Sequence, residues 1–245
     1  MDRAMKNLRA TYKKLVESEK LTKQQMDALL KRIHEAVAFE EVKKVDLVIE
    51  AVPENLLLKQ EIFSKLDKIC IPGTILATNT SSIPISLIAS ATKRSDRVIG
   101  THFFNPVLIM KGVELVKGRL TSQETIDTCL AFIKKLDKRP IVALDYAGFI
   151  TTRLIIPYLN EAAHAVAQGN DPKDVDEAML YCMNMPMGPC ALMDQIGIDV
   201  VVHAAETLTS EFDDRFKSPP LLRQMVRAGQ LGKKSDQGFF RYSEE

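Results

Sequence analysis

Polar side chains that could move protons occur at three points in an otherwise apolar part of the sequence. Residues 102–106 read His-Phe-Phe-Asn-Pro, residues 79–82 read Asn-Thr-Ser-Ser, and Glu114 follows downstream. An imidazole exchanges a proton near neutral pH, and a neighbouring carboxylate orients the ring and stabilises its protonated form. We therefore expect acid–base chemistry here, although each residue taken singly also fits the role of a strand-end cap or a buried polar group.

The elements that would position these groups alternate between strands and helices. Strands are predicted where β-branched and apolar residues run together, at 45–52, 74–78, 97–102, 113–116 and 140–144. Helices are predicted between them at 54–69, from Pro84, and at 123–136. This alternation predicts an α/β fold with a mainly parallel, doubly wound (Rossmann-like) sheet, in which chemistry takes place at the carboxyl ends of the strands.

The first part of the chain is predicted to form a helical hairpin over residues 2–36. Apolar residues recur with a helical period up to residue 19, and Thr22 with Gln25 has the spacing of a capping box that starts a second helix. One side of the hairpin is basic, through Lys6, Arg9, Lys13, Lys14, Lys20 and Lys23. That side is either a solvated charged face or a contact surface for a phosphate-bearing ligand.

After Asp145 the predicted elements are all helices. They cover about 148–168, 173–183, 189–209 and 219–229, and a further strand is possible only at the extreme C-terminus. The sequence therefore predicts two domains. The first is an α/β domain over 1–142, which includes the hairpin, and the second is an all-helical domain over 143–245.

Composition argues against several classes of protein. The net charge is only +1, which indicates no nucleic-acid partner, and no apolar run approaches the ~18 residues of a membrane span. The four cysteines are scattered without a CxxC pair, which favours a reducing, cytoplasmic compartment over a disulfide framework. The four histidines lack ligand spacing, so we expect no metal site.

One usual feature of a nucleotide-binding sheet is missing from the sequence. Such a sheet opens with a strand, a Gly-rich turn and a helix whose N-terminus holds the pyrophosphate, and an acidic residue after the second strand binds the ribose. No GxGxxG occurs here, and the first of the 11 glycines is Gly73. The sequence thus predicts either a protein that does not bind a dinucleotide in this way or the truncated remainder of a longer chain.

Several further motifs occur in order along the chain. They are Val48-Ile49-Glu50-Ala51-Val52-Pro53-Glu54-Asn55, Gly148-Phe149-Ile150, Pro157-Tyr158-Leu159-Asn160-Glu161, Pro186-Met187-Gly188-Pro189, and Leu231-Gly232-Lys233-Lys234 with Gly238-Phe239. Together with the two motifs quoted above, they resemble the L-3-hydroxyacyl-CoA dehydrogenase family, which includes the bacterial 3-hydroxybutyryl-CoA dehydrogenases. The likeness covers essentially the whole chain. It implies a NAD-dependent oxidoreductase that interconverts L-3-hydroxyacyl-CoA and 3-ketoacyl-CoA in fatty-acid or butanoate metabolism.

The resemblance also implies roles for the residues of the opening cluster. His102 matches the general base that takes the 3-hydroxyl proton, and Glu114 matches the carboxylate that pairs with it. Ser81 matches the hydroxyl that contacts the substrate oxygen. Near the nicotinamide, the matching positions are Asn79 and Asn105 together with Ser81. Further cofactor contacts match Ala51, Glu54, Lys59 and Lys234.

The family likeness also implies partners. The basic hairpin resembles the family's arm beside the CoA, and the helical domain resembles the family's dimerisation domain. We therefore expect an acyl-CoA substrate and a homodimer formed through the C-terminal helices.

Two departures from the family pattern leave a second hypothesis open. The opening strand, GxGxxG turn, helix and second strand are absent, and Thr152 stands where the family has an Asn before Arg153. A Thr hydroxyl is shorter than an amide and would need a water or a shifted substrate to take its place. The alternative is an inactive or partial remnant that dimerises or binds acyl-CoA without turnover.

Overall fold

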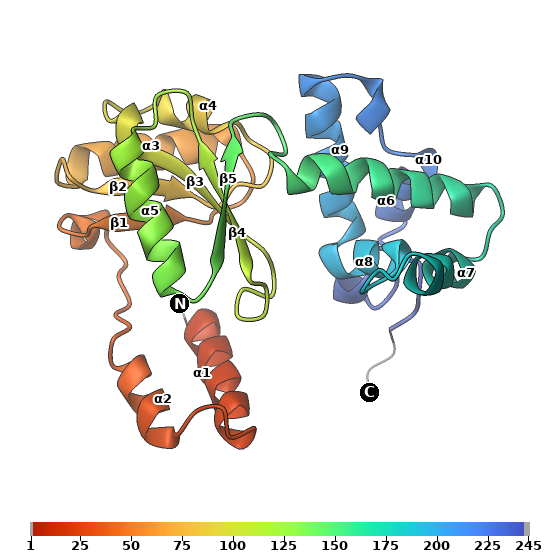
Figure 1. Ribbon diagram of the computed structural model, residues 1–245, viewed down its shortest axis with the longest axis horizontal. Coiled ribbons are helices and arrows are strands. Elements are labelled where there is room, and N and C mark those ends of the chain that lie inside the picture. The colour runs from red at the N-terminus through yellow and green to blue at the C-terminus, as the bar shows by residue number, and fades with distance from the viewer. Residues whose placement is uncertain (1, 243–245) are drawn as a thin grey trace. The chain divides into compact units, whose positions relative to one another are not determined.

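The computed structural model describes residues 2–242 of the chain. It divides into two compact units (Figure 1). The first contains the residues up to Val45 together with Ile69–Ile71, and the second contains Asp46–Lys68 and the chain from Pro72 onward.

The first unit is the predicted helical hairpin. Helix α1 spans Asp2–Glu17 and α2 spans Lys23–Leu30, followed by a 3-10 turn at Phe39–Val42. The capping box is confirmed, because the Gln25 backbone N–H donates to Thr22 Oγ1 at 3.1 Å and the Thr22 N–H donates to Gln25 Oε1 at 2.9 Å. Local cap chemistry therefore starts the second helix where the sequence predicts it.

The second unit begins with a five-stranded sheet in the order β1-β2-β3-β4-β5. The strands are β1 (Leu47–Glu50), β2 (Ile75–Thr78), β3 (Val98–Phe103), β4 (Gly112–Lys117) and β5 (Arg139–Leu144). The sheet is mainly parallel, as expected, but β4 runs antiparallel to β3. The connection 104–111 is too short for a parallel crossover, which takes a dozen or more residues, so the chain returns beside β3 as a hairpin.

Helices cover both faces of this sheet, which makes it doubly wound. They are α3 (Leu56–Ile69), α4 (Ile85–Ala89), a 3-10 turn at Ser95–Arg97, and α5 (Gln123–Lys135), which crosses the front of the sheet in Figure 1. Helix α5 buries Ile133 against Ile99 and Leu115 on one face. On the other face α4 packs so closely that a Cβ on Gly100 would lie 2.8 Å from the Ile85 side chain. Only a glycine fits at that position in β3.

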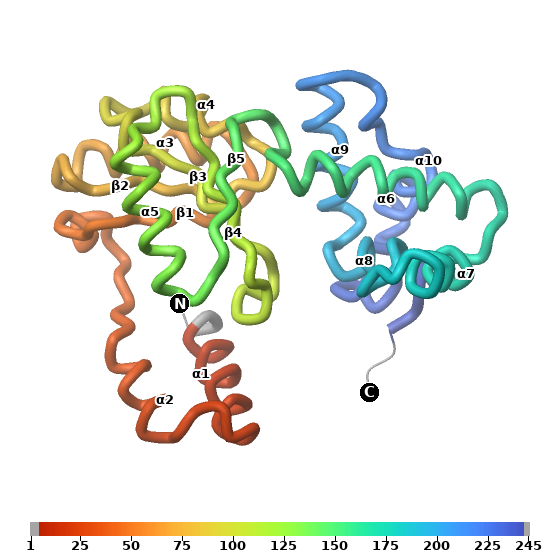
Figure 2. Tube along the Cα trace, in the orientation of Figure 1, coloured from red at the N-terminus to blue at the C-terminus, as the bar shows by residue number. Residues whose placement is uncertain are grey.

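The remainder of the second unit is helical, with one break that the sequence analysis missed. Its elements are α6 (Thr151–Ala167), α7 (Pro172–Glu177), a π turn (Ala178–Cys182), α8 (Pro189–Ile196), α9 (Ile198–Glu211), a 3-10 turn (Asp214–Phe216), α10 (Pro220–Arg227) and a 3-10 turn (Lys233–Ser235). The single helix predicted over 189–209 is wrong, because Gly197 has φ +104° and separates α8 from α9. Figure 2 labels α8 and α9 as two helices.

The last described residues are held by one buried carboxylate. Asp194 accepts hydrogen bonds from the backbone N–H groups of Phe239 and Phe240 and from the Tyr242 hydroxyl, each at 2.9 Å. In place of a C-terminal strand, the described chain up to residue 242 has isolated bridges that pair Gln237 with Gly232 and Arg241. Across the same described part, no helix is long and apolar enough to cross a bilayer.

Candidate active site

His102 and Glu114 form a buried pair at the centre of the sheet. They are direct partners in the antiparallel register of β3 and β4, and His102 Nδ1 lies 2.8 Å from Glu114 Oε2. The His102 residue is 7% exposed and Glu114 is fully buried. Residues directly opposite in neighbouring strands project on the same face, so the antiparallel pairing of β3 and β4 is what brings the two side chains together.

Both oxygens of the Glu114 carboxylate are hydrogen-bonded. Besides His102, the Thr151 hydroxyl donates to Oε2 at 2.7 Å, while the N–H groups of Thr151 and Ile150 donate to Oε1 at 2.9 and 3.2 Å. Burial raises the pKa of Glu114, but the hydrogen bonds from His102 and Thr151 outweigh it and leave that pKa below its usual value. Glu114 is therefore ionised at neutral pH.

The bond to Glu114 decides what the two ring nitrogens of His102 do. An ionised carboxylate only accepts hydrogen bonds, so Nδ1 carries the proton and Nε2 of the neutral ring keeps its lone pair. The ring also lies against Phe104, with centroids 4.4 Å apart, and against Phe149 at 5.9 Å. Held on three sides, the imidazole keeps Nε2 as an acceptor with a lone pair that no described contact occupies.

Glu54 organises the Asn-Thr-Ser-Ser loop that follows β2. Its Oε1 accepts hydrogen bonds from the N–H groups of Ser81 at 3.0 Å and Ser82 at 3.1 Å, and from the Thr80 hydroxyl at 2.5 Å. Burial raises the pKa of Glu54, but these bonds and the charge of Lys59 together leave it lowered. The Ser81 hydroxyl is half-buried and 3.4 Å from the same Oε1, so the described contacts place it with Glu54.

Lys59 on α3 is buried inside the protein. It is 1% exposed, and its Nζ lies 2.8 Å from Glu50 Oε1 and 3.4 Å from Glu54 Oε2. The ammonium also donates to the Val52 carbonyl at 3.3 Å. Lys59 thus links the end of β1 to the loop after it, and its predicted cofactor contact stays a prediction.

The remaining predicted residues lie in different places. Asn79 accepts a hydrogen bond from the Phe103 N–H at 2.9 Å and so joins the ends of β2 and β3. Ala51 and Asn105 are exposed just after β1 and β3. Thr152 lies half-buried in the first turn of α6. Lys234 lies in the helical part, where it forms an ion pair with Asp199.

Both parts of the chain match known protein families. Residues 1–146 match the model of the 3-hydroxyacyl-CoA dehydrogenase NAD binding domain, and residues 148–242 match that of the 3-hydroxyacyl-CoA dehydrogenase C-terminal domain. The chain belongs to the 3-hydroxyacyl-CoA dehydrogenase family. The resemblance seen in the sequence motifs is thereby confirmed.

Relatives match over nearly the whole chain. It is 43% identical to the probable 3-hydroxybutyryl-CoA dehydrogenase of Bacillus subtilis, over 98% of this chain and 85% of that protein. It is 44% identical to the 3-hydroxybutyryl-CoA dehydrogenase of Clostridioides difficile, over 99% of this chain and 87% of that protein. The crystal structure of (S)-3-hydroxybutyryl-CoA dehydrogenase from Ralstonia eutropha superposes with a TM-score of 0.94 at 39% identity, over 99% of this chain and 87% of that one.

The groups at the strand ends suit the nicotinamide half of NAD, the cofactor of this dehydrogenase family. The amides of Asn79 and Asn105 and the hydroxyl of Ser81 are uncharged donors and acceptors, which complement a carboxamide and ribose hydroxyls. They follow parallel strands at the edge where an open α/β sheet binds its ligands. Ala51 follows β1 at the same edge.

Two residues that hold the site together, Thr151 and Asp145, were not anticipated from the sequence. Thr151 directly follows the Gly148-Phe149-Ile150 motif, but that motif does not predict that the Thr151 hydroxyl reaches Glu114. Asp145, the first residue after β5, accepts a hydrogen bond from the Ser86 N–H at 2.8 Å and so caps α4, which follows the Ser81 loop. Both contacts join parts of the chain that are far apart in sequence, and no local pattern indicates them.

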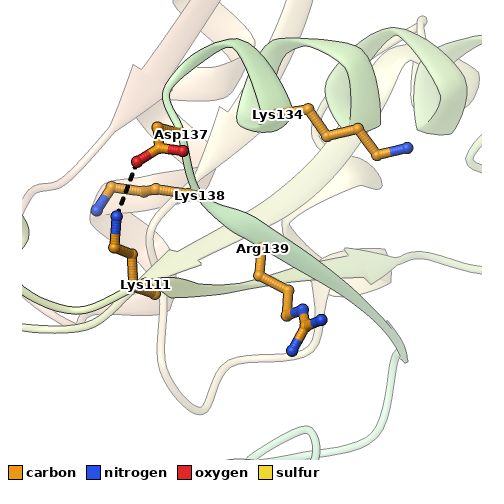
Figure 3. Close-up of a pocket in the computed structure, with 5 residues that line it drawn as sticks. All are labelled: Lys111, Lys134, Asp137, Lys138 and Arg139. Carbon is orange, nitrogen blue, oxygen red and sulfur yellow. Dashed lines mark hydrogen bonds and ion pairs between the residues drawn. The ribbon is translucent and has the colours of Figure 1, made fainter.

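A basic pocket of about 370 Å³ lies at the start of β5 (Figure 3). It is lined by Lys111, Lys134, Asp137, Lys138 and Arg139. Lys111 Nζ pairs with Asp137 Oδ2 at 2.8 Å, and Lys138 Nζ donates to the Met110 carbonyl at 2.7 Å. None of the lining residues is a candidate catalytic group, and Lys138 holds the loop between β3 and β4.

Proposed function

We propose that this chain interconverts L-3-hydroxyacyl-CoA and 3-ketoacyl-CoA with NAD. The observation that carries the proposal is the buried His102–Glu114 pair, with Nδ1 of the imidazole bonded to the carboxylate at 2.8 Å. This arrangement leaves Nε2 able to take the proton of the substrate's 3-hydroxyl group. NAD held beside Asn79, Asn105 and Ser81 would supply the acceptor for the hydride of carbon 3.

The two residues divide the proton chemistry between them. His102 Nε2 accepts the hydroxyl proton during oxidation and returns it to the ketone oxygen during reduction. Glu114 stays ionised, fixes the tautomer and stabilises the imidazolium that forms. The Ser81 hydroxyl, 3.4 Å from Glu54 Oε1, turns to donate to the same substrate oxygen when substrate binds, and Thr152 lies beside the substrate carbonyl. The relatives named for 3-hydroxybutyryl-CoA support a short acyl chain as the substrate to test.

A second candidate function is acyl-CoA binding without turnover. The printed sequence has no GxGxxG turn to hold a pyrophosphate, and Thr152 replaces the family's amide. The basic side of the hairpin of residues 2–36 by itself offers cations that suit a phosphate-bearing ligand such as CoA.

One pair of measurements separates the two functions. We expect the purified chain to oxidise NADH in the presence of acetoacetyl-CoA, at a rate well above that of His102→Asn. Calorimetry then measures the affinity for NADH and for acetoacetyl-CoA separately. Binding of acetoacetyl-CoA with no turnover above that of the variant would reject the dehydrogenase and support the second candidate. If neither turnover nor binding were detected, both functions would be rejected.

The helical part of the chain supports a homodimer as part of this proposal. Its surface exposes large apolar side chains, including Leu154 at 70%, Tyr181 at 80% and Met183 at 64%. Burying such groups against a second copy is favourable at about 25 cal/mol per Å². Light scattering should give twice the chain mass of 27.4 kDa, and Tyr181→Glu should shift it toward the monomer. A monomeric wild type would contradict the proposal.

The cytoplasm is the compartment we propose. Cys70, Cys129, Cys182 and Cys190 are all free thiols, and burial raises the pKa of Cys129 to about 11. Thiols kept in this form suit a reducing environment.

A further inference from the structure

The carboxylate of Glu114 is held by two elements at once. From the sheet side, His102 on β3 donates to Oε2. From the other side come the Thr151 hydroxyl to Oε2 and the N–H groups of Ile150 and Thr151 to Oε1. Three of these four hydrogen bonds therefore come from the start of α6.

These hydrogen bonds also satisfy backbone N–H groups at the start of α6. The first N–H groups of a helix have no partner within it, and α6 has no hydrogen bond from the side chain of its own N-cap residue, Ile150. Glu114 takes that role from a different element, and a negative charge at a helix N-terminus is favourable. The carboxylate that orients His102 is thus also the cap of α6.

Thr151 is the side chain that makes this arrangement rigid. Its hydroxyl and His102 Nδ1 bind the same oxygen, at 2.7 and 2.8 Å, so the carboxylate cannot rotate without losing both bonds. Thr is β-branched, which limits the rotation of its own side chain. The backbone N–H groups of Ile150 and Thr151 can donate to Glu114 whatever the side chain at position 151. A substitution there therefore removes only the hydrogen bond of the hydroxyl.

We propose that Thr151 is a positioning residue for the reaction, which fixes Glu114 and through it the tautomer and orientation of His102. The effect of Thr151 on turnover rests on the proposed function. This role gives the start of α6 a part in the proton chemistry, although Thr151 itself need not touch the substrate.

The first test compares variants at residue 151 by steady-state kinetics. Thr151→Val keeps the shape but loses the hydroxyl, and we expect kcat to fall about tenfold with KM unchanged, the size expected for one hydrogen bond to a charged group. The acid limb of the pH profile should move to higher pH, because Glu114 loses one of the bonds that lower its pKa. Thr151→Ser keeps the hydroxyl and should restore both.

A matched control removes a threonine hydroxyl elsewhere in the helical part. Thr209 is half-buried on α9, and its Oγ1 donates to the Ala205 carbonyl at 2.7 Å. Thr209→Val should leave kcat and the pH profile unchanged. A Thr151→Val enzyme that behaves like Thr209→Val would overturn the positioning role.

A second test does not depend on turnover. The proton on His102 Nδ1, bonded to a buried carboxylate, should give a downfield imidazole signal in the proton NMR spectrum that is absent from His102→Asn. We expect Thr151→Val to broaden or abolish this signal and Thr151→Ser to retain it. An unchanged signal in Thr151→Val would reject the inference. If the wild type shows no turnover, the proposed function fails while this signal still decides the role of Thr151.

Discussion

Replacing His102 with Asn lowers kcat for NADH-dependent reduction of acetoacetyl-CoA by about a thousandfold, within the range that general acid–base groups contribute. The Asn side-chain N–H takes the place of imidazole Nδ1 and can keep the bond to Glu114, while Nε2, the proton donor during reduction, disappears. The fold should therefore survive and the proton transfer should not. Steady-state kinetics together with a thermal unfolding curve check both parts.

The chain offers a matched control for this substitution. His203 is exposed on α9 and lies outside the proposed site, so His203→Asn should leave kcat unchanged. If His102→Asn retained more than about a tenth of the wild-type rate, another group would have to donate the proton, since a single misplaced hydrogen bond already accounts for a loss of that size.

Replacing Lys59 with Met destabilises the protein by about 3–5 kcal/mol, the cost of leaving a buried charge without its partner. The ammonium of Lys59 lies 2.8 Å from Glu50 and 3.4 Å from Glu54, at 1% exposure of its own side chain. Met fills a similar volume but donates no hydrogen bond, so two carboxylates lose their common cation. Urea unfolding at pH 7 measures the difference.

Lys65 provides the control for this prediction on the same helix. Its ammonium pairs with Glu61 at 2.6 Å, but both side chains are more than half exposed. Such exposed pairs contribute little, so Lys65→Met should change the free energy of unfolding by less than about 0.5 kcal/mol. Equal effects of the two substitutions would show that the Lys59 pair is not buried in solution.

The stability that Lys59→Met loses should depend on pH, because the substitution changes the pKa of Glu54. In the wild type, Thr80 and Lys59 outweigh burial and lower the pKa of Glu54, so its ionised form contributes stability above the unfolded-state pKa that is lost as pH falls through the folded-state value. Without Lys59 the pKa of Glu54 rises. The deficit should therefore shrink as the pH is lowered and the carboxyl is protonated, which unfolding curves between pH 7 and pH 4 would show.

Local patterns in the sequence were sufficient for most of the elements, while the pairing of His102 with Glu114 was implied only by the family likeness. Apolar runs marked all five strands, and the Thr22–Gln25 spacing marked the start of α2, because strand burial and helix capping depend on residues close together in the chain. His102 and Glu114 stood out by residue type and by family likeness. The break at Gly197 could have been anticipated from a glycine in a long apolar helix pattern.

The tertiary structure alone decided how these residues act on one another. The antiparallel return of β4 sets Glu114 opposite His102, α6 brings Thr151 to the same carboxylate, and α3 carries Lys59 into a buried ion pair. Each contact joins segments that are separated along the chain, and its strength depends on the exclusion of water by everything packed around it. The sequence by itself thus determined which groups are available for proton transfer, while only the fold determined which of them are buried, charged and held together.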